Sequence, residues 1–329
     1  KKKKKLWPGV WPALLSGVGA RMVTLTCLSN TGQVLIVGNH QTHWVHSGGL
    51  TIHAVTEGHP DSTPLVLVHG YPDNLQVWDK VSAALSQEYL VIRYDVRGAG
   101  KSGKPRKTRD YRLALLADDL QAVVDTLIPG REFHLIAHDW GAIQSWESVT
   151  GESLQNRIRS YTSISGPCLD HIGFWLRKQL ETPGLAGAAK VLQQLTSSWY
   201  VFLFQVPVIP EMIWKAGLDR LWPGYLKHHE QVADARFSAS QKSDGLYGVK
   251  LYRANFLTRL LRPRTRVARC PVQVIIPTRD AYVRPQLNEH LVRWTGKLTL
   301  QTLDTTHWAP LTEPEAVSRA VRTFVAAHP

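Results

Sequence analysis

The chain has 329 residues, of which 43% are hydrophobic, and its mean hydropathy is -0.18. These values are typical of a globular protein with a large buried core, and no apolar run reaches the roughly 20 residues that a transmembrane helix needs. The net charge is +13, but no motif of a nucleic-acid-binding fold accompanies it, so we expect a solvated basic surface and no nucleic-acid partner.

Residues 1–42 are predicted to be a basic N-terminal extension of unknown role. They begin with Lys1–Lys5, and Leu6–Ala20 has the apolar composition of a signal peptide or membrane anchor. Because Pro8 and Pro12 interrupt this stretch, we favour an upstream extension over a signal or anchor. The apolar residues between 23 and 37 are compatible with a hairpin.

The three cysteines, Cys27, Cys168 and Cys270, are too few and too irregularly spaced for a disulfide framework. We therefore expect reduced thiols and a cytoplasmic protein. No pattern indicates the oligomeric state, and the sequence is compatible with a homodimer.

Eight segments from His43 onward have the length and composition of strands. The first two alternate apolar and polar residues around Gly48-Gly49, as in an antiparallel hairpin, and most of the others are continuous apolar runs, as in a buried sheet. The predicted strands are His43–Ser47, Leu50–Val55, Leu65–His69, Leu90–Tyr94, Phe133–Ala137, Tyr161–Ser165, Val272–Pro277 and Leu298–Leu303. Helices are predicted between them at Gln76–Gln87, Leu113–Leu127 and Ala142–Val149, and after them at Glu315–Ala327. This alternation predicts an α/β fold with a doubly wound, mostly parallel, eight-stranded sheet.

The alternation stops between Gly166 and about Arg269. This stretch is helical in pattern, rich in aromatic residues and broken by prolines. It predicts a helical lid over residues 167–269, inserted after the sixth strand into a core made of residues 43–166 and 270–329.

The segment from Leu135 to Ala142 has the pattern of a nucleophile elbow. A short apolar strand runs into a turn flanked by the small residues Ala137 and Gly141, and a helix follows. The tip of this turn carries Asp139 where a serine hydrolase carries serine. A carboxylate that attacks a saturated carbon forms an ester, which water can cleave, so Asp139 points to epoxide opening or halide displacement.

Two further residues follow the last two predicted strands. Asp280 comes just after Val272–Pro277, and His307 comes just after Leu298–Leu303, which gives the order nucleophile, acid, histidine. Since Asp139 needs no base, we expect His307 to deprotonate the water that cleaves the ester, and Asp280 to orient His307. Asp304 is the alternative acid.

These motifs, together with His69-Gly70-Tyr71-Pro72 and the segment from Asp95 to Ser102, resemble the α/β-hydrolase fold and, within it, the epoxide hydrolases. The resemblance runs from His43 to Pro329 and is similar to the hydrolase half of actinobacterial proteins that join an epoxide hydrolase to a dehydrogenase. The last predicted element is the closing helix, so we expect only the hydrolase half in these residues.

The resemblance implies two further parts of the site. The backbone N–H groups of Tyr71 and Trp140 are expected to form an oxyanion hole, and the lid tyrosines Tyr200 and Tyr252 to donate hydrogen bonds to the epoxide oxygen. Tyr247 is the nearest competitor for the second tyrosine. Thr306 stands where many relatives have glycine before the histidine, which puts the backbone shape of that loop in question.

We expect an apolar pocket for a small epoxide substrate. Its predicted lining residues are His69, Pro72, His138, Trp199 and Trp308. A dehalogenase is the alternative function; haloalkane dehalogenases typically have Asn where this chain has Tyr71, and haloacetate dehalogenases typically have Arg in place of Trp140. A non-catalytic receptor on the same fold is the third.

No cofactor or metal is expected. Gly98–Gly103 matches a dinucleotide-binding pattern, but Lys104–Lys107 does not continue it as a helix. His40, His43 and His46 are spaced by three, and on a strand neighbours at this spacing point to opposite faces, so a shared metal ion is not expected.

Overall fold

The computed structural model describes residues 40–181, 183–235 and 238–329. The predicted N-terminal extension therefore lies outside the described residues, except for residues 40–42, and so does the hairpin considered between residues 23 and 37. The protein has an eight-stranded sheet in the order β1-β2-β4-β3-β5-β6-β7-β8. The pairs β1–β2 and β2–β4 are antiparallel, and the remaining pairs are parallel.

The strand bounds are close to those predicted from the sequence. They are β1 Gln41–Ser47, β2 Leu50–Glu57, β3 Pro64–Val68, β4 Leu90–Tyr94, β5 Phe133–His138, β6 Ile158–Ile164, β7 Val272–Pro277 and β8 Leu298–Leu303. The α-helices of the core are α1 Asp79–Leu85, α2 Leu113–Leu127, α3 Trp140–Val149, α10 Ala309–Thr312 and α11 Pro314–Ala326. Short turns of helix occur at η1 Leu75–Trp78, η2 Thr108–Tyr111, η4 Pro285–Asn288 and η5 Leu291–Trp294.

The sheet is buried on both faces, and β3 shows how its sequence achieves this. Val66 and Val68 pack in the apolar cluster that includes α2 and α3, whereas Leu65 and Leu67 pack in the cluster that includes α1 and α11. All four side chains are fully buried, because alternate residues of a strand point to opposite faces and both faces carry helices.

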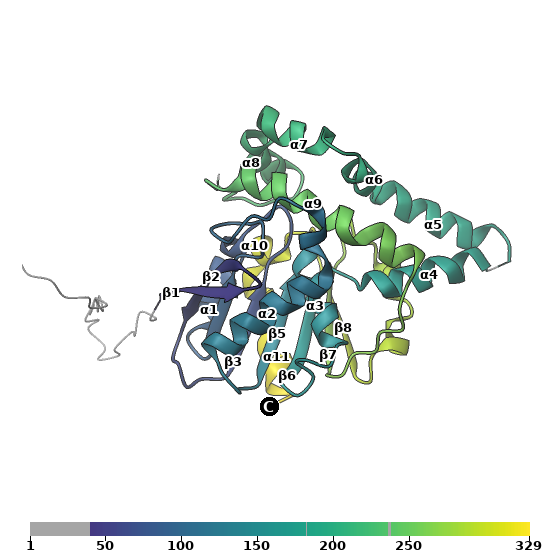
Figure 1. Ribbon diagram of the computed structural model, residues 1–329. Coiled ribbons are helices and arrows are strands. Elements are labelled where there is room, and N and C mark those ends of the chain that lie inside the picture. Colours follow the sequence, from purple (N-terminus) through teal and green to yellow (C-terminus); the bar gives the residue numbers. More distant parts are fainter. Residues whose placement is uncertain (1–39, 182, 236–237) are drawn as a thin grey trace, which may run out of the picture. The chain divides into compact units, whose positions relative to one another are not determined.

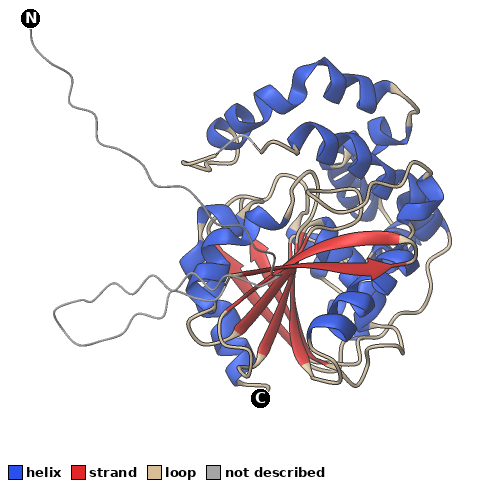
Figure 2. Ribbon diagram, turned by 60° about the vertical axis from the view of Figure 1, so that its left-hand side comes forward, coloured by secondary structure: helices blue, strands red, loops and turns tan. Residues whose placement is uncertain are grey.

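The second group of helices forms a cap between β6 and β7. It consists of α4 Leu169–Glu181, α5 Leu185–Ser197, α6 Trp199–Gln205, α7 Ile209–Ile213, η3 Trp214–Leu218, α8 Asp219–His228 and α9 Gln241–Leu261. Figure 1 shows these helices above the sheet, and Figure 2 shows the strands running toward them. The cap therefore covers the carboxyl ends of the parallel strands, where ligands bind in open α/β sheets.

The long helix α9 connects the cap to the core through buried polar groups. Asn255 accepts a hydrogen bond from the Leu113 amide at 3.0 Å and donates one to the Tyr111 carbonyl at 2.9 Å. Asp244 accepts hydrogen bonds from the Gly100 amide at 2.9 Å and from the Asn74 side chain at 3.2 Å. These bonds hold α9 in a defined place over the sheet.

Candidate active site

Asp139 lies at a sharp turn between β5 and α3. Its backbone angles are φ 53° and ψ -125°, a conformation that non-glycine residues rarely adopt. The turn needs small neighbours: a Cβ atom on Gly141 would lie 2.2 Å from the Val68 carbonyl oxygen, so only glycine fits there. This strained turn raises the Asp139 side chain from the carboxyl end of the sheet, as in a nucleophile elbow.

His307 lies between two carboxylates. Its Nε2 is 3.4 Å from Asp139 Oδ2, and its Nδ1 is 3.0 Å from Asp280 Oδ2. All three residues are buried, with exposed fractions of 7% for Asp139, 4% for Asp280 and 2% for His307. The structure thus brings the three predicted residues together in the order carboxylate, imidazole, carboxylate.

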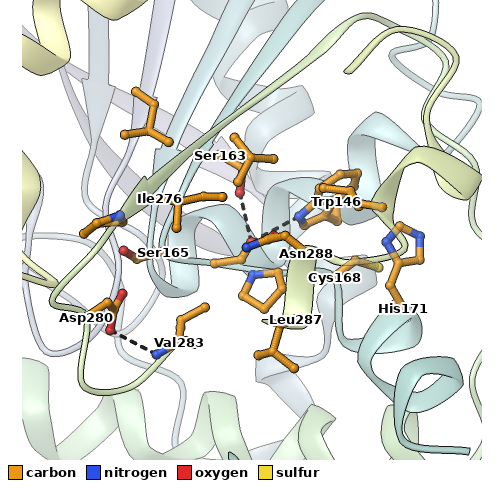
Figure 3. A pocket seen from close by; sticks show the side chains of 16 residues that line it. Trp146, Ser163, Ser165, Cys168, His171, Ile276, Asp280, Val283, Leu287 and Asn288 are labelled. Atoms are coloured by element: carbon orange, nitrogen blue, oxygen red, sulfur yellow. Dashed lines mark hydrogen bonds between the residues drawn. The ribbon is translucent and has the colours of Figure 1, made fainter. Parts of the chain in front are cut away.

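The surroundings of Asp280 favour its charged form. Burial alone would raise its pKa, but His307 and the amides of Val283 and Tyr282 hold the pKa below its usual range. Those amides donate to Asp280 Oδ1 at 2.9 Å and 2.8 Å, and Figure 3 shows the bond from Val283. Asp280 therefore remains a carboxylate that can hold the imidazole in one orientation.

The two carboxyl groups beside His307 favour its protonated form. Burial would lower its pKa, but the charges of Asp280 and Asp139 raise the pKa well above its usual range. Removing the charge of Asp139 would remove one of these two contributions. The proton affinity of His307 is thus coupled to the chemical state of Asp139.

The Tyr71 amide lies at the predicted oxyanion hole. It donates a hydrogen bond to Asp139 Oδ1 at 2.7 Å. A Cβ atom on Gly70 would lie 2.3 Å from Asp139 Oδ1 and 2.7 Å from the Trp140 nitrogen, so this oxygen and the Trp140 amide lie beside the same point. Trp140 is also the first residue of α3, where helix amides are free to bind an anion.

An apolar cavity of about 550 Å³ extends from Asp139 into the cap. The predicted residues that line it are Pro72, Trp199, Tyr200, Tyr252 and Trp308, together with Asp139, His307 and Tyr71. The rings of Tyr200 and Tyr252 are perpendicular, with centroids 6.0 Å apart. A smaller cavity of about 80 Å³ also reaches Asp139, and Tyr200 and Tyr252 line it too. Both tyrosines therefore border the space next to the carboxylate.

His69 and His138 do not line either of these cavities, and their predicted place in the pocket is corrected. The Val96 amide donates to His69 Nε2 at 2.9 Å, and His138 Nε2 donates to the His307 carbonyl at 2.9 Å. Burial lowers the pKa of His138 to about 4, so it is neutral. Both imidazoles bind backbone groups, and His138 thereby holds the loop that carries His307.

The structure also shows where Asp304, Tyr247 and Thr306 lie. Asp304 has an 84% exposed side chain that pairs with Arg279 at 3.0 Å, so it is not the partner of His307. Tyr247 lies outside the lining of both cavities. The Thr306 hydroxyl donates to the Glu230 carbonyl at 2.7 Å, so the residue that replaces glycine connects the His307 loop to the cap.

Sequence reasoning missed several aromatic residues of the large cavity. Tyr282, Tyr225, Phe204, Trp214 and Trp222 line it, and the Tyr225 and Tyr282 hydroxyls hydrogen-bond to each other. One signal was present for Tyr282, because it lies two residues after Asp280 in a loop at the carboxyl end of a strand. The cap residues carried no comparable signal.

A separate small cavity of about 20 Å³ borders Asp280 (Figure 3). Ser163 and Trp146 both donate to the Gly166 carbonyl beside it, at 3.0 Å and 3.1 Å. Its size suits about one water molecule and excludes a substrate. Within the described part of the chain, no group of three or more His, Cys, Asp or Glu side chains could hold a metal ion.

The sequence of the chain is similar to those of several known proteins. A family model for the alpha/beta hydrolase fold matches residues 63–314. The chain is 32% identical over 286 residues to the probable oxidoreductase EphD of Mycobacterium tuberculosis; this match covers 84% of the chain but 48% of that protein, so the chain spans about half of its length. It is 23% identical over 339 residues to epoxide hydrolase 4 of Homo sapiens, covering 98% of the chain and 88% of that protein.

Two solved structures illustrate the shared fold. A mutant epoxide hydrolase from Bacillus megaterium in complex with its diol product has a TM-score of 0.70 and 19% identity, over 86% of this chain and 100% of that chain. The epoxide hydrolase VrEH1 from Vigna radiata has a TM-score of 0.69 and 21% identity, over 90% of this chain and 100% of that one. At these identities the likeness establishes the fold.

Proposed function

The chain belongs to the α/β-hydrolase fold family, and on that premise we propose that it is an epoxide hydrolase that converts an apolar epoxide and water into a vicinal diol. The observation that carries the proposal is the pairing of a carboxylate at the elbow with two tyrosines beside the same space. A carboxylate serves attack on a saturated carbon, and phenol groups serve a leaving oxygen that needs a proton.

In the first step Asp139 attacks an epoxide carbon and forms an ester. The carbon–oxygen bond of the ring breaks. The released oxygen takes a proton from one of the Tyr200 and Tyr252 hydroxyls, which becomes a phenolate, and a hydrogen bond from the other. Burial raises the pKa of both tyrosines, so they are neutral donors before the reaction.

In the second step water cleaves the ester. Ester formation removes the negative charge of Asp139, so one of the two charges that hold the proton on His307 disappears. The lowered pKa lets His307 give up its proton, which restores the tyrosine that protonated the released oxygen. The neutral imidazole then accepts a proton from water. The water oxygen attacks the ester carbonyl, and the amides of Tyr71 and Trp140 stabilise the resulting oxyanion. Collapse of this intermediate expels the diol oxygen, which takes a proton from His307. The new Asp139 carboxyl group then gives a proton back to His307, and this restores the starting carboxylate and imidazolium.

The test is parallel turnover of styrene oxide, 1,2-epoxyhexane and 1-chlorohexane, scored for diol and for chloride. We expect diol from the epoxides and no chloride. Chloride release without diol would instead identify a dehalogenase, and saturable binding of all three without turnover would identify a receptor.

A further inference from the structure

Exposed apolar side chains are concentrated on one part of the cap. Among the described residues, eleven of the eighteen large apolar side chains that are exposed lie between residues 185 and 221. We call them the cap apolar face: Leu185, Leu192, Leu195, Trp199, Phe202, Val206, Val208, Ile209, Met212, Ile213 and Leu221. Concentrated exposed apolar surface marks an interaction site, whereas single exposed residues do not.

The cap apolar face lies on the outermost helices. Figure 1 shows α5, α6 and α7 following one another on the side of the cap that faces away from the sheet. Exposure is high along this path, with 85% for Leu185, 64% for Trp199 and 60% for Met212. These side chains thus point away from the core that the rest of the cap covers.

The exposed charged side chains within residues 183–229 are all basic, and the exposed Glu289 outside that segment is paired with Lys190 of α5. Lys215, Arg220 and Lys227 are exposed, while no exposed acidic residue occurs between residues 183 and 229. The two acids in that stretch are Glu211, which pairs with Arg253, and Asp219, which is buried. An apolar surface with a basic border complements an anionic lipid surface.

The large cavity opens through this same surface. Trp199, Ile213 and Leu221 belong to the cap apolar face, and each of them also lines the cavity that leads to Asp139. A molecule dissolved in whatever covers this face would therefore meet the mouth of the cavity directly.

We propose that the cap apolar face rests on the surface of an anionic lipid bilayer, and that the substrate enters the cavity from the acyl-chain layer. The second half of this proposal rests on the proposed function. A second copy of the chain fits less well, because a symmetric contact through this face would bring Lys215, Arg220 and Lys227 of both copies together, and residues 183–229 hold no exposed acid to offset them.

The geometry suits docking in the plane of the membrane. In the described part of the chain, no single helix is long and apolar enough to cross a bilayer, and only the pair Trp199–Gln205 and Ile209–His228 passes by length and composition. That pair is bent by 99°. A bent, amphipathic segment with cations at its border is expected to lie at the interface rather than cross it.

The binding test is sedimentation of the full chain with vesicles of phosphatidylcholine alone or with one third phosphatidylglycerol. We expect binding to the anionic vesicles and weak binding to the neutral ones. The double variant Ile209→Glu with Met212→Glu places two acids on the cap apolar face outside the cavity lining, and we expect it to lose binding. Lys215→Gln and Arg220→Gln should each weaken binding about fivefold.

The matched control places the same acids on exposed apolar positions of the core. Val292→Glu with Leu300→Glu changes side chains that are 69% and 52% exposed and far along the chain from the cap. We expect this variant to bind vesicles like the unchanged chain. Equal loss in both double variants, or no binding to either vesicle, would overturn the proposal. So would a concentration-dependent dimer that the Ile209 and Met212 variant abolishes, because the face would then be a contact between copies.

Substrate entry is tested separately with an apolar epoxide held in the vesicles and a water-soluble one in buffer. The Ile209 and Met212 double variant should keep its turnover of the soluble epoxide and lose at least tenfold with the vesicle-held epoxide. An equal effect on both substrates would contradict entry from the bilayer. If the chain turned over no epoxide at all, the proposed function would fail, while the sedimentation result would still decide whether the face binds lipid.

Discussion

The core and the outer cap hold their functional residues in different ways. Asp139, Asp280 and His307 are all buried. The Tyr71 amide binds the Asp139 carboxylate, and the Tyr282 amide and the His307 ring bind that of Asp280. Helix α6, which carries Tyr200, has one buried residue, Val201. The proposed attacking and proton-accepting groups thus lie on a tightly packed core, whereas the proposed entry surface is built from loosely packed apolar helices.

Tyr200 and Tyr252 also differ in how firmly they are held. Tyr252 is 3% exposed on α9, the helix whose Asn255 and Asp244 bind core backbone groups. Tyr200 is only partly buried and lies on the outer helix α6. Tyr252 is therefore held by contacts with the core, whereas Tyr200 belongs to the outer cap.

We expect the largest loss of turnover from a change in the buried core site. Asp139→Ala should abolish turnover, because Asp139 is the one carboxylate among the described residues that line the two cavities. Diol formation is measured by chromatography, and thermal unfolding checks that the variant is folded. Diol production by a folded Asp139→Ala protein would sink the proposed mechanism.

The next prediction concerns ring opening, to which Tyr252 of α9 and Tyr200 of the outer cap are both proposed to contribute. Tyr200→Phe and Tyr252→Phe should each slow ring opening by about 10²–10³-fold, and the double variant should be nearly inactive. The rate of Asp139 alkylation is measured by rapid quenching and mass spectrometry.

Tyr247→Phe is the control for both tyrosines, since that side chain lies on α9 outside both cavities and contacts Lys250 instead. Its rate should equal that of the unchanged chain. An undiminished alkylation rate in the double variant would remove Tyr200 and Tyr252 from the mechanism.

The third effect separates the two steps within the core. His307→Gln should still open the epoxide but should release diol about 10²–10⁴-fold more slowly, because the water loses its base. The intact protein should gain one substrate mass, and peptide mapping should place it on Asp139. A folded variant that binds substrate without ever gaining mass would indicate direct attack by water.

The smallest expected effect is on the free energy of unfolding, and it involves Asp73 in the loop after β3, which contacts Trp308 of the site. Burial raises the pKa of Asp73 to about 7, although Trp308 Nε1 donates to its carboxylate at 2.8 Å. A folded-state pKa above the unfolded value means that the folded state holds the proton more tightly, so stability is fully present below about pH 4 and falls as pH rises toward 7.

Asp73→Asn should remove this dependence. We expect its free energy of unfolding, from urea titration, to exceed that of the unchanged chain by about 1–2 kcal/mol at pH 8, and the difference to shrink toward pH 4. Asp304→Asn, at an exposed carboxylate, is the control. A difference that stays constant from pH 4 to pH 8 would show that Asp73 does not carry the raised pKa.

The sequence predicted the sheet and the elbow well, because buried parallel strands leave continuous apolar runs. The predicted bounds of β4, β7 and β8 match the structure, whereas β6 begins at Ile158 rather than Tyr161. The missed start contains Arg159 and Ser160, whose polar side chains interrupt the apolar run at the end of the strand. The apolar sequence pattern of a strand is weakest at its ends.

The directions of side chains were harder to predict than their positions. His69 and His138 flank the site along the chain, but both rings point to backbone groups, which sequence spacing does not reveal. In the outer cap, exposed apolar residues such as Leu192 and Met212 obscure the one-sided periodicity that marks a helix of a globular protein. The bounds of these helices therefore depended on packing.

The hydrogen bond from the Tyr71 amide to Asp139 Oδ1 makes the two carboxylate oxygens unequal. On the proposed mechanism, the oxygen on the His307 side attacks, becomes the bridging oxygen of the ester and leaves with the diol. The oxygen held by Tyr71 stays on the protein, and the vacated position is refilled by an oxygen from water. In heavy-oxygen water the first diol released by each molecule should thus be unlabelled, every later diol should carry one heavy atom, and Asp139 should retain a single label.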